Sequence, residues 1–194
     1  MQQVRFSLVS RILHWLLAAL VLAMLVIGAV MVSFGGRYDW LYSVHRPIGI
    51  AILVLAAIRL INRLIDTPPP LPATMRRSLR GAAQASHVLL YALLIVQPLV
   101  GWGLLSAAGY PVILYSAVEL PPLLPKSDAL VALLRPAHLV LAIILSVVIL
   151  LHFGAALMHR FAFRDGVFES MAFGRRRTMA IPREGQTGAF RDDD

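Results

Sequence analysis

The fold is decided by one stretch of sequence, HLVLAIILSVVILLHFGAALMH, which runs from His138 to His159. Its first 21 residues contain no Asp, Glu, Lys or Arg, and about 20 apolar residues are enough to cross the hydrocarbon core of a bilayer. His138 and His152 are 14 residues apart, so on a helix they share nearly one face, ~21 Å apart along the axis. An ionisable residue inside a membrane segment indicates a functional site. The stretch therefore predicts a transmembrane helix that presents two histidines at two depths.

Three further apolar stretches bring the number of predicted membrane spans to four. They cover residues 12–32, about 42–64 and about 81–108. The hydrophobic content is 59% and the mean hydropathy is +0.76, whereas soluble domains are usually about 45–50% apolar. A signal peptide is the rival interpretation of the first stretch, but no small-residue cleavage site follows it. We predict an all-α fold, an integral membrane four-helix bundle.

The histidine and cysteine content limits which metal cofactors this bundle could bind. All six histidines lie in or beside the apolar stretches, and the chain has no cysteine. Thiolate-held iron–sulfur clusters and covalent C-x-x-C-H haem attachment are therefore excluded. Imidazole suits haem iron and also zinc, but zinc requires three or four ligands at one level. Opposed histidine pairs at two depths instead predict that the bundle encloses two non-covalently bound haems, with interhelical hydrogen bonding as the alternative role.

Depth in the membrane sorts the six histidines into an outer and an inner level. His45 and His138 open the second and fourth spans from the same side and have no rival there. We call them the outer pair. Four histidines compete for the inner level, and we favour His14 with His152, the inner pair, because His152 lies deeper than His159. The predicted cofactor-binding residues, and the predicted axial ligands of the haem iron, are His14, His45, His138 and His152.

Other residues are secondary candidates around the same two levels. Arg59 lies 14 residues after His45 and points toward the inner level, where it would bind a haem propionate or extend to the interface. His87 and His159 are candidates for contact with a propionate or a quinone. Gly28 and Gly101 fall at the outer level, where a residue without a side chain lets a macrocycle approach the backbone, or lets helices pack closely.

The distribution of Lys and Arg predicts the orientation. With four spans, 14 of these residues fall on the side of the termini and 4 on the other side. Positive residues are enriched in cytoplasmic segments, so we expect a multi-pass membrane protein with both termini in the cytoplasm. The net charge of +8 could indicate binding to nucleic acid. Because the positive residues cluster at the ends of the spans, we instead expect them to face the membrane surface, with lipid as the partner. We expect residues 1–170 to form the di-haem membrane domain and residues 171–194 to form a cytoplasmic, mobile tail.

Several motifs resemble those of the bacterial cytochrome b561 family. They are RILHW at residues 11–15, HRPIGI at 45–50, HVLLY at 87–91, and His138 followed by LHFGAALMH at 151–159. The resemblance covers about residues 5–170. It implies a location in the bacterial inner membrane, two b haems held by the outer and inner pairs, electron exchange with the quinone pool, and, in at least one member, superoxide:ubiquinone oxidoreductase activity.

Two function classes follow from these features. The first is a membrane di-haem b cytochrome, an oxidoreductase that transfers single electrons between a small donor, such as superoxide, and ubiquinone. The second is a haem-bearing membrane anchor that exchanges electrons with a redox partner protein, a dehydrogenase or hydrogenase subunit. A helical scaffold without haem is a third class, which a reduced-minus-oxidised absorption spectrum would test.

Overall fold

Four long helices dominate the molecule. The computed structural model describes residues 5–35, 37, 39–66, 75–114 and 118–173. The long helices are α1 (Leu8–Ser33), α2 (Asp39–Ile65), α3 (Arg77–Ala108) and α4 (Asp128–Met158). Each is long and apolar enough to cross a membrane. The predicted helical membrane bundle is confirmed.

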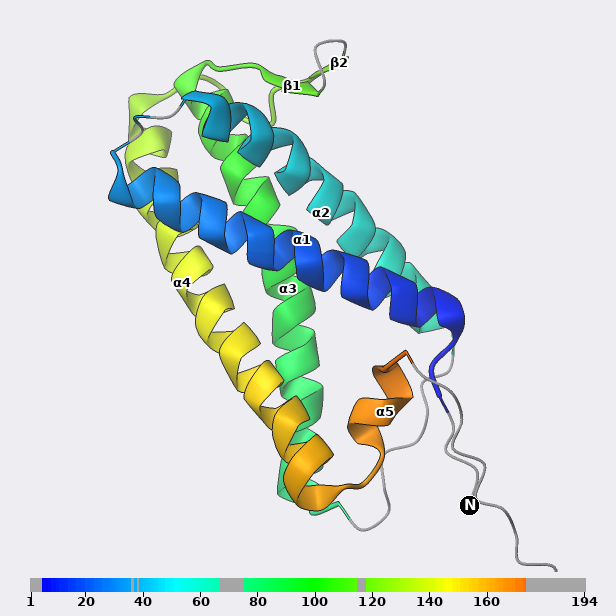
Figure 1. Ribbon diagram of the computed structural model, residues 1–194. Helices are drawn as coiled ribbons and strands as arrows, with labels where there is room; N and C mark the ends of the chain where they lie inside the picture. The colour runs from blue at the N-terminus through cyan, green and yellow to red at the C-terminus, as the bar shows by residue number, and fades with distance from the viewer. Residues whose placement is uncertain (1–4, 36, 38, 67–74, 115–117, 174–194) are drawn as a thin grey trace, which may run out of the picture.

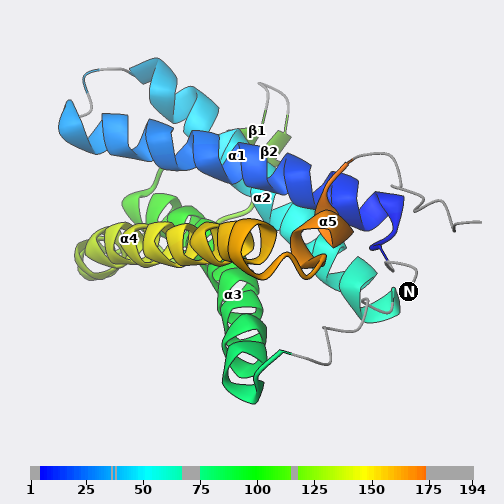
Figure 2. The ribbon, with the colours of Figure 1, turned by 60° about the horizontal axis from the view of Figure 1, so that its bottom comes forward.

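The helices associate as two pairs. α1 packs along α2, α3 packs along α4, and α2 joins the pairs through its contact with α3. The pairs lie close together at one end, which carries a short β-hairpin, and separate toward the other end, where the short helix α5 (Val167–Met171) lies (Figure 1). The view turned by 60° shows how far α3 diverges from the direction of α1 (Figure 2). We call these two ends the hairpin end and the α5 end.

The core is a thin apolar layer in the middle of the bundle. All four long helices contribute to it, and its buried members are Leu17, Val21, Ile52, Ala56, Leu93, Leu145 and Val148. In every helix these residues lie between the two predicted histidine levels. On α4, for example, Leu145 and Val148 fall between His138 and His152. The core therefore separates the outer pair from the inner pair.

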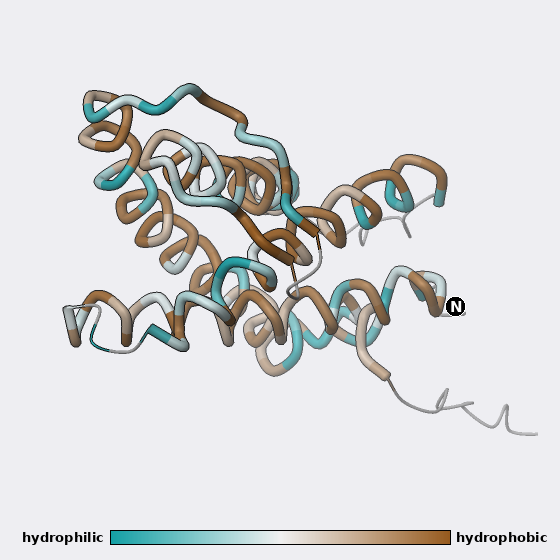
Figure 3. The backbone as a smooth tube through the Cα atoms, turned by 90° about the horizontal axis from the view of Figure 1, so that it is seen from above, coloured by the Kyte–Doolittle hydropathy of each residue, from teal (hydrophilic) through white to brown (hydrophobic). Residues whose placement is uncertain are grey.

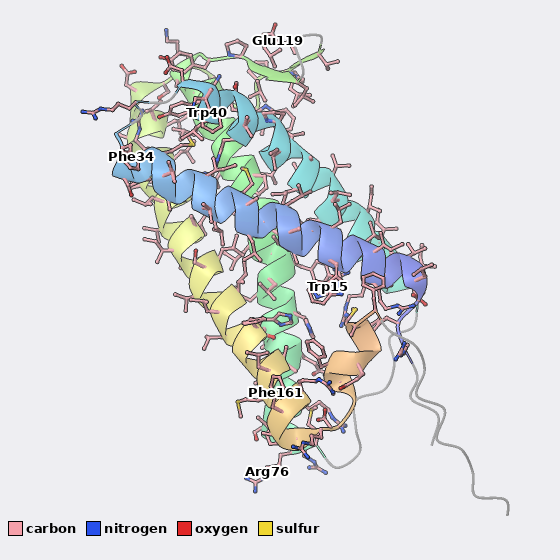
Figure 4. All side chains as sticks on the ribbon, in the orientation of Figure 1. Trp15, Phe34, Trp40, Arg76, Glu119 and Phe161 are labelled. Carbon is pink, nitrogen blue, oxygen red and sulfur yellow. The ribbon has the colours of Figure 1, made fainter. Side chains whose placement is uncertain are left out.

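The outside of the bundle is apolar as well. Hydrophobic residues predominate along the helices (Figure 3), and many large ones are exposed, such as Leu150 at 69% and Val26 at 65%. Aromatic side chains gather near both ends, with Phe34 and Trp40 toward the hairpin and Trp15 and Phe161 toward α5 (Figure 4). Aromatic residues are enriched at both membrane interfaces. This distribution fits a bundle whose outer surface faces lipid.

The structure corrects the expected start of the fourth helix. The sequence predicted a membrane span that starts at His138, but α4 begins at Asp128. Ser127 is its N-cap, since the Ser127 side chain accepts a hydrogen bond from the backbone N–H of Leu130 at 3.4 Å. Pro136 lies inside the helix, which membrane helices tolerate because neighbouring groups satisfy the freed carbonyl. The helix therefore begins ten residues before the predicted span.

The rest of that loop contains the only β-structure among the described residues. Strand β1 (Val112–Leu114) pairs antiparallel with β2 (Val118–Leu120). This hairpin adds a small β element to the predicted all-α fold. Val112 is 3% exposed, so the hairpin packs on the bundle.

The α5 end is closed by a return of the chain onto α1. After α4 comes a π-helix (His159–Phe163) and then α5. The backbone N–H of Phe6 donates to the carbonyl of Ser170 at 3.2 Å, and the indole N–H of Trp15 donates to the carbonyl of Met171 at 3.0 Å. Residues 171–173, the start of the predicted tail, thus lie against α1. The remainder of that tail, residues 174–194, falls outside the described residues.

Candidate functional site

The outer pair meets across the bundle near the hairpin end. His45 comes from the second turn of α2 and His138 from the middle part of α4, which is held beside α3. Their ring centres are 6.3 Å apart and their planes meet at 71°. Both side chains are half-buried. The sequence predicted this juxtaposition from depth alone.

The inner pair meets at the other side of the apolar core. His14 on α1 and His152 on α4 have ring centres 6.4 Å apart and planes at 89°. His87 on α3 also approaches His152, with ring centres 5.5 Å apart. His152 therefore lies between two imidazoles, and the structure brings three of the four inner-level candidates together.

Ring separation distinguishes His14 from His87 as the partner of His152. Two imidazoles on opposite sides of one metal ion, each with a nitrogen about 2 Å from the metal, place their ring centres roughly 6 Å apart. The separations in the outer pair, 6.3 Å, and the inner pair, 6.4 Å, both match this value. The 5.5 Å between His87 and His152 is shorter. The geometry thus favours His14 as the opposed ligand and leaves His87 beside the site.

The outer pair also contains polar atoms that need a partner. The Nδ1 atoms of His45 and His138 are buried and form no hydrogen bond within the described residues. Buried polar groups without a partner are rare and costly. Among the described residues no group of three or more His, Cys, Asp or Glu could hold a metal ion by itself. Opposed imidazoles with unpaired nitrogens, and no cluster of protein ligands, fit the axial positions of a haem.

Two glycines lie against the outer pair, as their spacing predicted. A Cβ atom on Gly101 would stand 3.0 Å from Cε1 of His138, and one on Gly28 would stand 3.9 Å from Cε1 of His45. The first distance is shorter than an ordinary carbon contact of about 3.5–4.0 Å, and the second is not. A side chain at Gly101 would therefore force the His138 ring to shift by a few tenths of an ångström, whereas one at Gly28 would make an ordinary contact.

We expect Gly101→Ala to reduce the haem content of the purified protein from two haems per chain toward one. The added methyl group displaces the His138 ring, and the inner pair, on the far side of the apolar core, is unaffected. A pyridine haemochrome assay measures the change. Gly28→Ala is the matched control and should keep both haems. An equal loss in both variants would mean that the glycines serve helix packing and not the imidazole.

Arg59 lies in a small polar cluster beside the inner pair. Its Nη1 donates to the backbone carbonyl of Ser10 at 2.8 Å, one helical turn before His14. The Ser10 hydroxyl donates to Asp66 at 3.1 Å and accepts from the Asn62 amide at 2.6 Å. Arg59 therefore points into the bundle, and its guanidinium is placed near the inner level, where a propionate would need a cation.

His159 is set apart from the inner pair. It opens the π-helix, and its Nδ1 lies 2.6 Å from Asp165 Oδ2, with both side chains largely buried at 14% and 17% exposure. Its ring also contacts Phe163. Its nearest described partners therefore belong to the α5 end. The sequence did not predict the contact with Asp165.

Sequence reasoning also missed Gln97. The amide nitrogen of Gln97 on α3 donates to the backbone carbonyl of His138 at 3.0 Å and lies 3.4 Å from His138 Nε2. A signal for it existed, because Gln97 is the only amide side chain in the apolar run from residue 88 to residue 105. A buried polar residue within a membrane segment usually has a specific partner.

Comparison with known proteins identifies the fold and its chemistry. The family model for the prokaryotic cytochrome b561 matches residues 5–174. The chain belongs to the prokaryotic cytochrome b561 family. It is 31% identical over 171 residues to cytochrome b561 homolog 2 of Escherichia coli (strain K12), covering 86% of this chain and 90% of that one. It is 28% identical over 172 residues to the probable superoxide oxidase CybB of Yersinia pestis, covering 86% and 95%.

Membership in the cytochrome b561 family accounts for the class of the protein. It is a membrane electron-transfer protein, and its family implies haem b as the cofactor. Four apolar helices and a prokaryotic family model agree with a bacterial membrane protein. Within this b561 bundle the paired histidines are the residues whose geometry fits a haem.

Proposed function

We propose that the protein is a di-haem b cytochrome that passes single electrons between a small donor and ubiquinone. The observation that carries this proposal is the presence of two histidine pairs with ring centres 6.3 and 6.4 Å apart. They lie at two levels of one bundle, because His138 and His152 are separated by 14 residues, or ~21 Å, along α4. One pair would support one haem, and two separated pairs support two.

The chain's own residues supply placement and electrostatics. Haem iron supplies one-electron chemistry, with a potential set by axial ligands, burial and nearby charge. The outer pair and the inner pair would hold the two irons, and the Arg59 guanidinium would bind a propionate at the inner level. The apolar layer around Leu17, Ala56 and Leu145 excludes water between the levels.

The donor and the acceptor are inferred from chemistry and from a relative. The Yersinia pestis protein is called a probable superoxide oxidase, and superoxide gives up one electron to become dioxygen. Two superoxide ions thus supply the two electrons that, with two protons, convert ubiquinone to ubiquinol. The outer face carries four cationic and three acidic side chains, for a net charge of +1, so electrostatic steering of the anion is weak. The outer cations are Arg37, Arg46, Lys126 and Arg135.

We also propose the inner membrane as the location, with both termini in the cytoplasm. The support is the ratio of 14 to 4 in Lys and Arg between the two sides. In this orientation the hairpin end faces outward and the α5 end, with His159 and the Arg59 cluster, faces the cytoplasm. His87 and His159 are then candidates for contact with a propionate or with ubiquinone from the cytoplasmic leaflet.

The proposal predicts two b haems per chain. A pyridine haemochrome assay on the purified protein should give this ratio, and the ferric spectrum should be that of low-spin, bis-histidine iron. One haem per chain would contradict the two-pair arrangement. A double variant, His45→Ala with His152→Ala, is the control and should contain no haem.

The alternative function is that of a membrane anchor for a dehydrogenase or hydrogenase partner. The activity of the isolated chain distinguishes the two functions. Purified protein in lipid vesicles containing ubiquinone is supplied with superoxide from a xanthine and xanthine oxidase system. Formation of ubiquinol at a rate above that of vesicles without the protein supports the oxidoreductase. Full haem content with no ubiquinol formation would favour the anchor.

A further inference from the structure

Gln97 makes an unusual double contact with one histidine of the outer pair. Its Nε2 atom donates to the backbone carbonyl of His138 at 3.0 Å and stands 3.4 Å from Nε2 of the same residue's imidazole. The residue lies on α3 one turn before Gly101, where an added Cβ would stand 3.0 Å from Cε1 of the same ring. The His138 ring thus lies against two consecutive turns of α3.

Two further polar atoms of these residues lack a partner. Gln97 Oε1 is a buried acceptor and His138 Nδ1 is a buried imidazole nitrogen, and neither forms a hydrogen bond within the described residues. Buried polar groups that stay unpaired are unfavourable. Gln97 reaches the imidazole through its amide nitrogen, which lies 3.4 Å from His138 Nε2, so pairing Oε1 with a ring N–H requires the amide to rotate.

A His138 imidazole that holds a metal would need such a hydrogen-bond partner. A neutral imidazole has one nitrogen that carries a proton and one that does not. When the unprotonated nitrogen binds a metal, the other N–H needs an acceptor, and metal-bound histidines nearly always have one. That acceptor fixes the ring orientation and increases electron donation to the metal.

We propose that Gln97 is a positioning residue of the outer haem. Its amide oxygen accepts the hydrogen bond from the N–H of His138 that does not face the iron, while the amide stays anchored next to the His138 backbone. The inference rests on the proposed function, because it requires His138 to be an axial ligand. It adds that the two ligands of the outer haem differ, since among the described residues the Gln97 amide contacts the imidazole and the backbone carbonyl of His138.

The expected consequence is a lower reduction potential for the outer haem. An acceptor on the second imidazole nitrogen makes the ligand a stronger electron donor and stabilises ferric iron. Removal of this hydrogen bond should favour the ferrous state. The equilibrium constant for reduction should rise roughly three- to tenfold, which is the size of one net hydrogen bond.

The test compares Gln97→Leu with Gln97→Glu in the full-length holoprotein. The outer haem is defined as the one that His45→Ala removes, and its potential is measured by redox titration. The ferric electron paramagnetic resonance g-values are recorded as well, because they respond to the electron donation of the axial imidazole. We expect Leu to raise the potential and Glu, a stronger acceptor, to lower it, with g-values that move in opposite directions. Gln84→Leu, an exposed position on the same helix, is the matched control and should change neither.

The outcomes separate this inference from the proposed function. Two haems with unchanged potentials and g-values in both Gln97 variants would overturn the inference alone. Shifts in the same direction for Leu and Glu would indicate a structural role in helix contact and would also overturn it. If Gln97→Leu fails to assemble, a Gln97→Glu variant whose g-values stay at the wild-type position is enough to reject it. Failure of the proposed function is different, since His45→Ala would then retain both haems.

Discussion

His45→Ala and His138→Ala are each expected to leave the purified protein with one haem instead of two. The outer pair has no substitute, because the other four histidines lie on the far side of the apolar core or at the α5 end. Each substitution leaves an opposed imidazole without its counterpart 6.3 Å away. A haem held by two histidines would keep only one of its two protein ligands. We therefore expect the outer haem to be lost and the inner haem to be kept.

The measurement is a pyridine haemochrome ratio together with a reduced-minus-oxidised spectrum of each variant. His87→Ala serves as the control, because it removes an intramembrane histidine that stands beside a pair without completing one. It should keep both haems. Two haems in either outer-pair variant would show that the assigned depths are wrong.

His152→Ala and His159→Ala are expected to have opposite effects on the inner haem. His152 faces His14 at a separation that suits a metal ion between them. His159 lies seven residues further along the chain, ~10 Å closer to the α5 end, and its Nδ1 already lies 2.6 Å from Asp165 Oδ2. A haem at His159 would also be ~31 Å along the axis from one at His138, instead of ~21 Å.

His152→Ala should therefore reduce the protein to one haem, whereas His159→Ala should retain two and at most slow the reduction of ubiquinone. Haem content is measured as above, and quinol formation is followed in vesicles. Asp165→Asn is a useful companion, because it weakens the partner of His159 without touching the imidazole and should resemble His159→Ala. Loss of haem from His159→Ala with full content in His152→Ala would reverse the assignment.

The parts of this site that follow helical periodicity could be predicted from the sequence. Spacings of 14 residues put Gly28, counted from His14, at the outer level and Arg59, counted from His45, at the inner level. The structure places Gly28 against the outer pair and Arg59 beside the inner one. Depth along a helix follows from residue number alone. The proximity of His138 and His45 could therefore be predicted without any knowledge of how their rings are oriented.

Features that depend on rotation between helices, or on irregular backbone, could not be predicted. The contact of Gln97 with His138 requires the relative rotation of α3 and α4, which sequence spacing does not contain. His159 and Asp165 are six residues apart, which on an α-helix would place them about 120° apart around the axis. They meet because a π-helix intervenes and Arg164 takes a left-handed conformation with φ of 50°. The early start of α4 was hidden because Pro136 is typical of a loop.

The attachment of α5 to α1 has a consequence for biogenesis. Synthesis proceeds from the N-terminus, so the first membrane helix emerges long before the carbonyls of Ser170 and Met171 that bind Phe6 and Trp15. During translation the splayed end of the bundle has no closing segment, and the inner level is open to cofactor delivery from that side. A nascent chain that stops before residue 167 has all six histidines and all four spans but lacks this closure. We therefore expect the contacts of α5 with α1 to form after the four spans are in place.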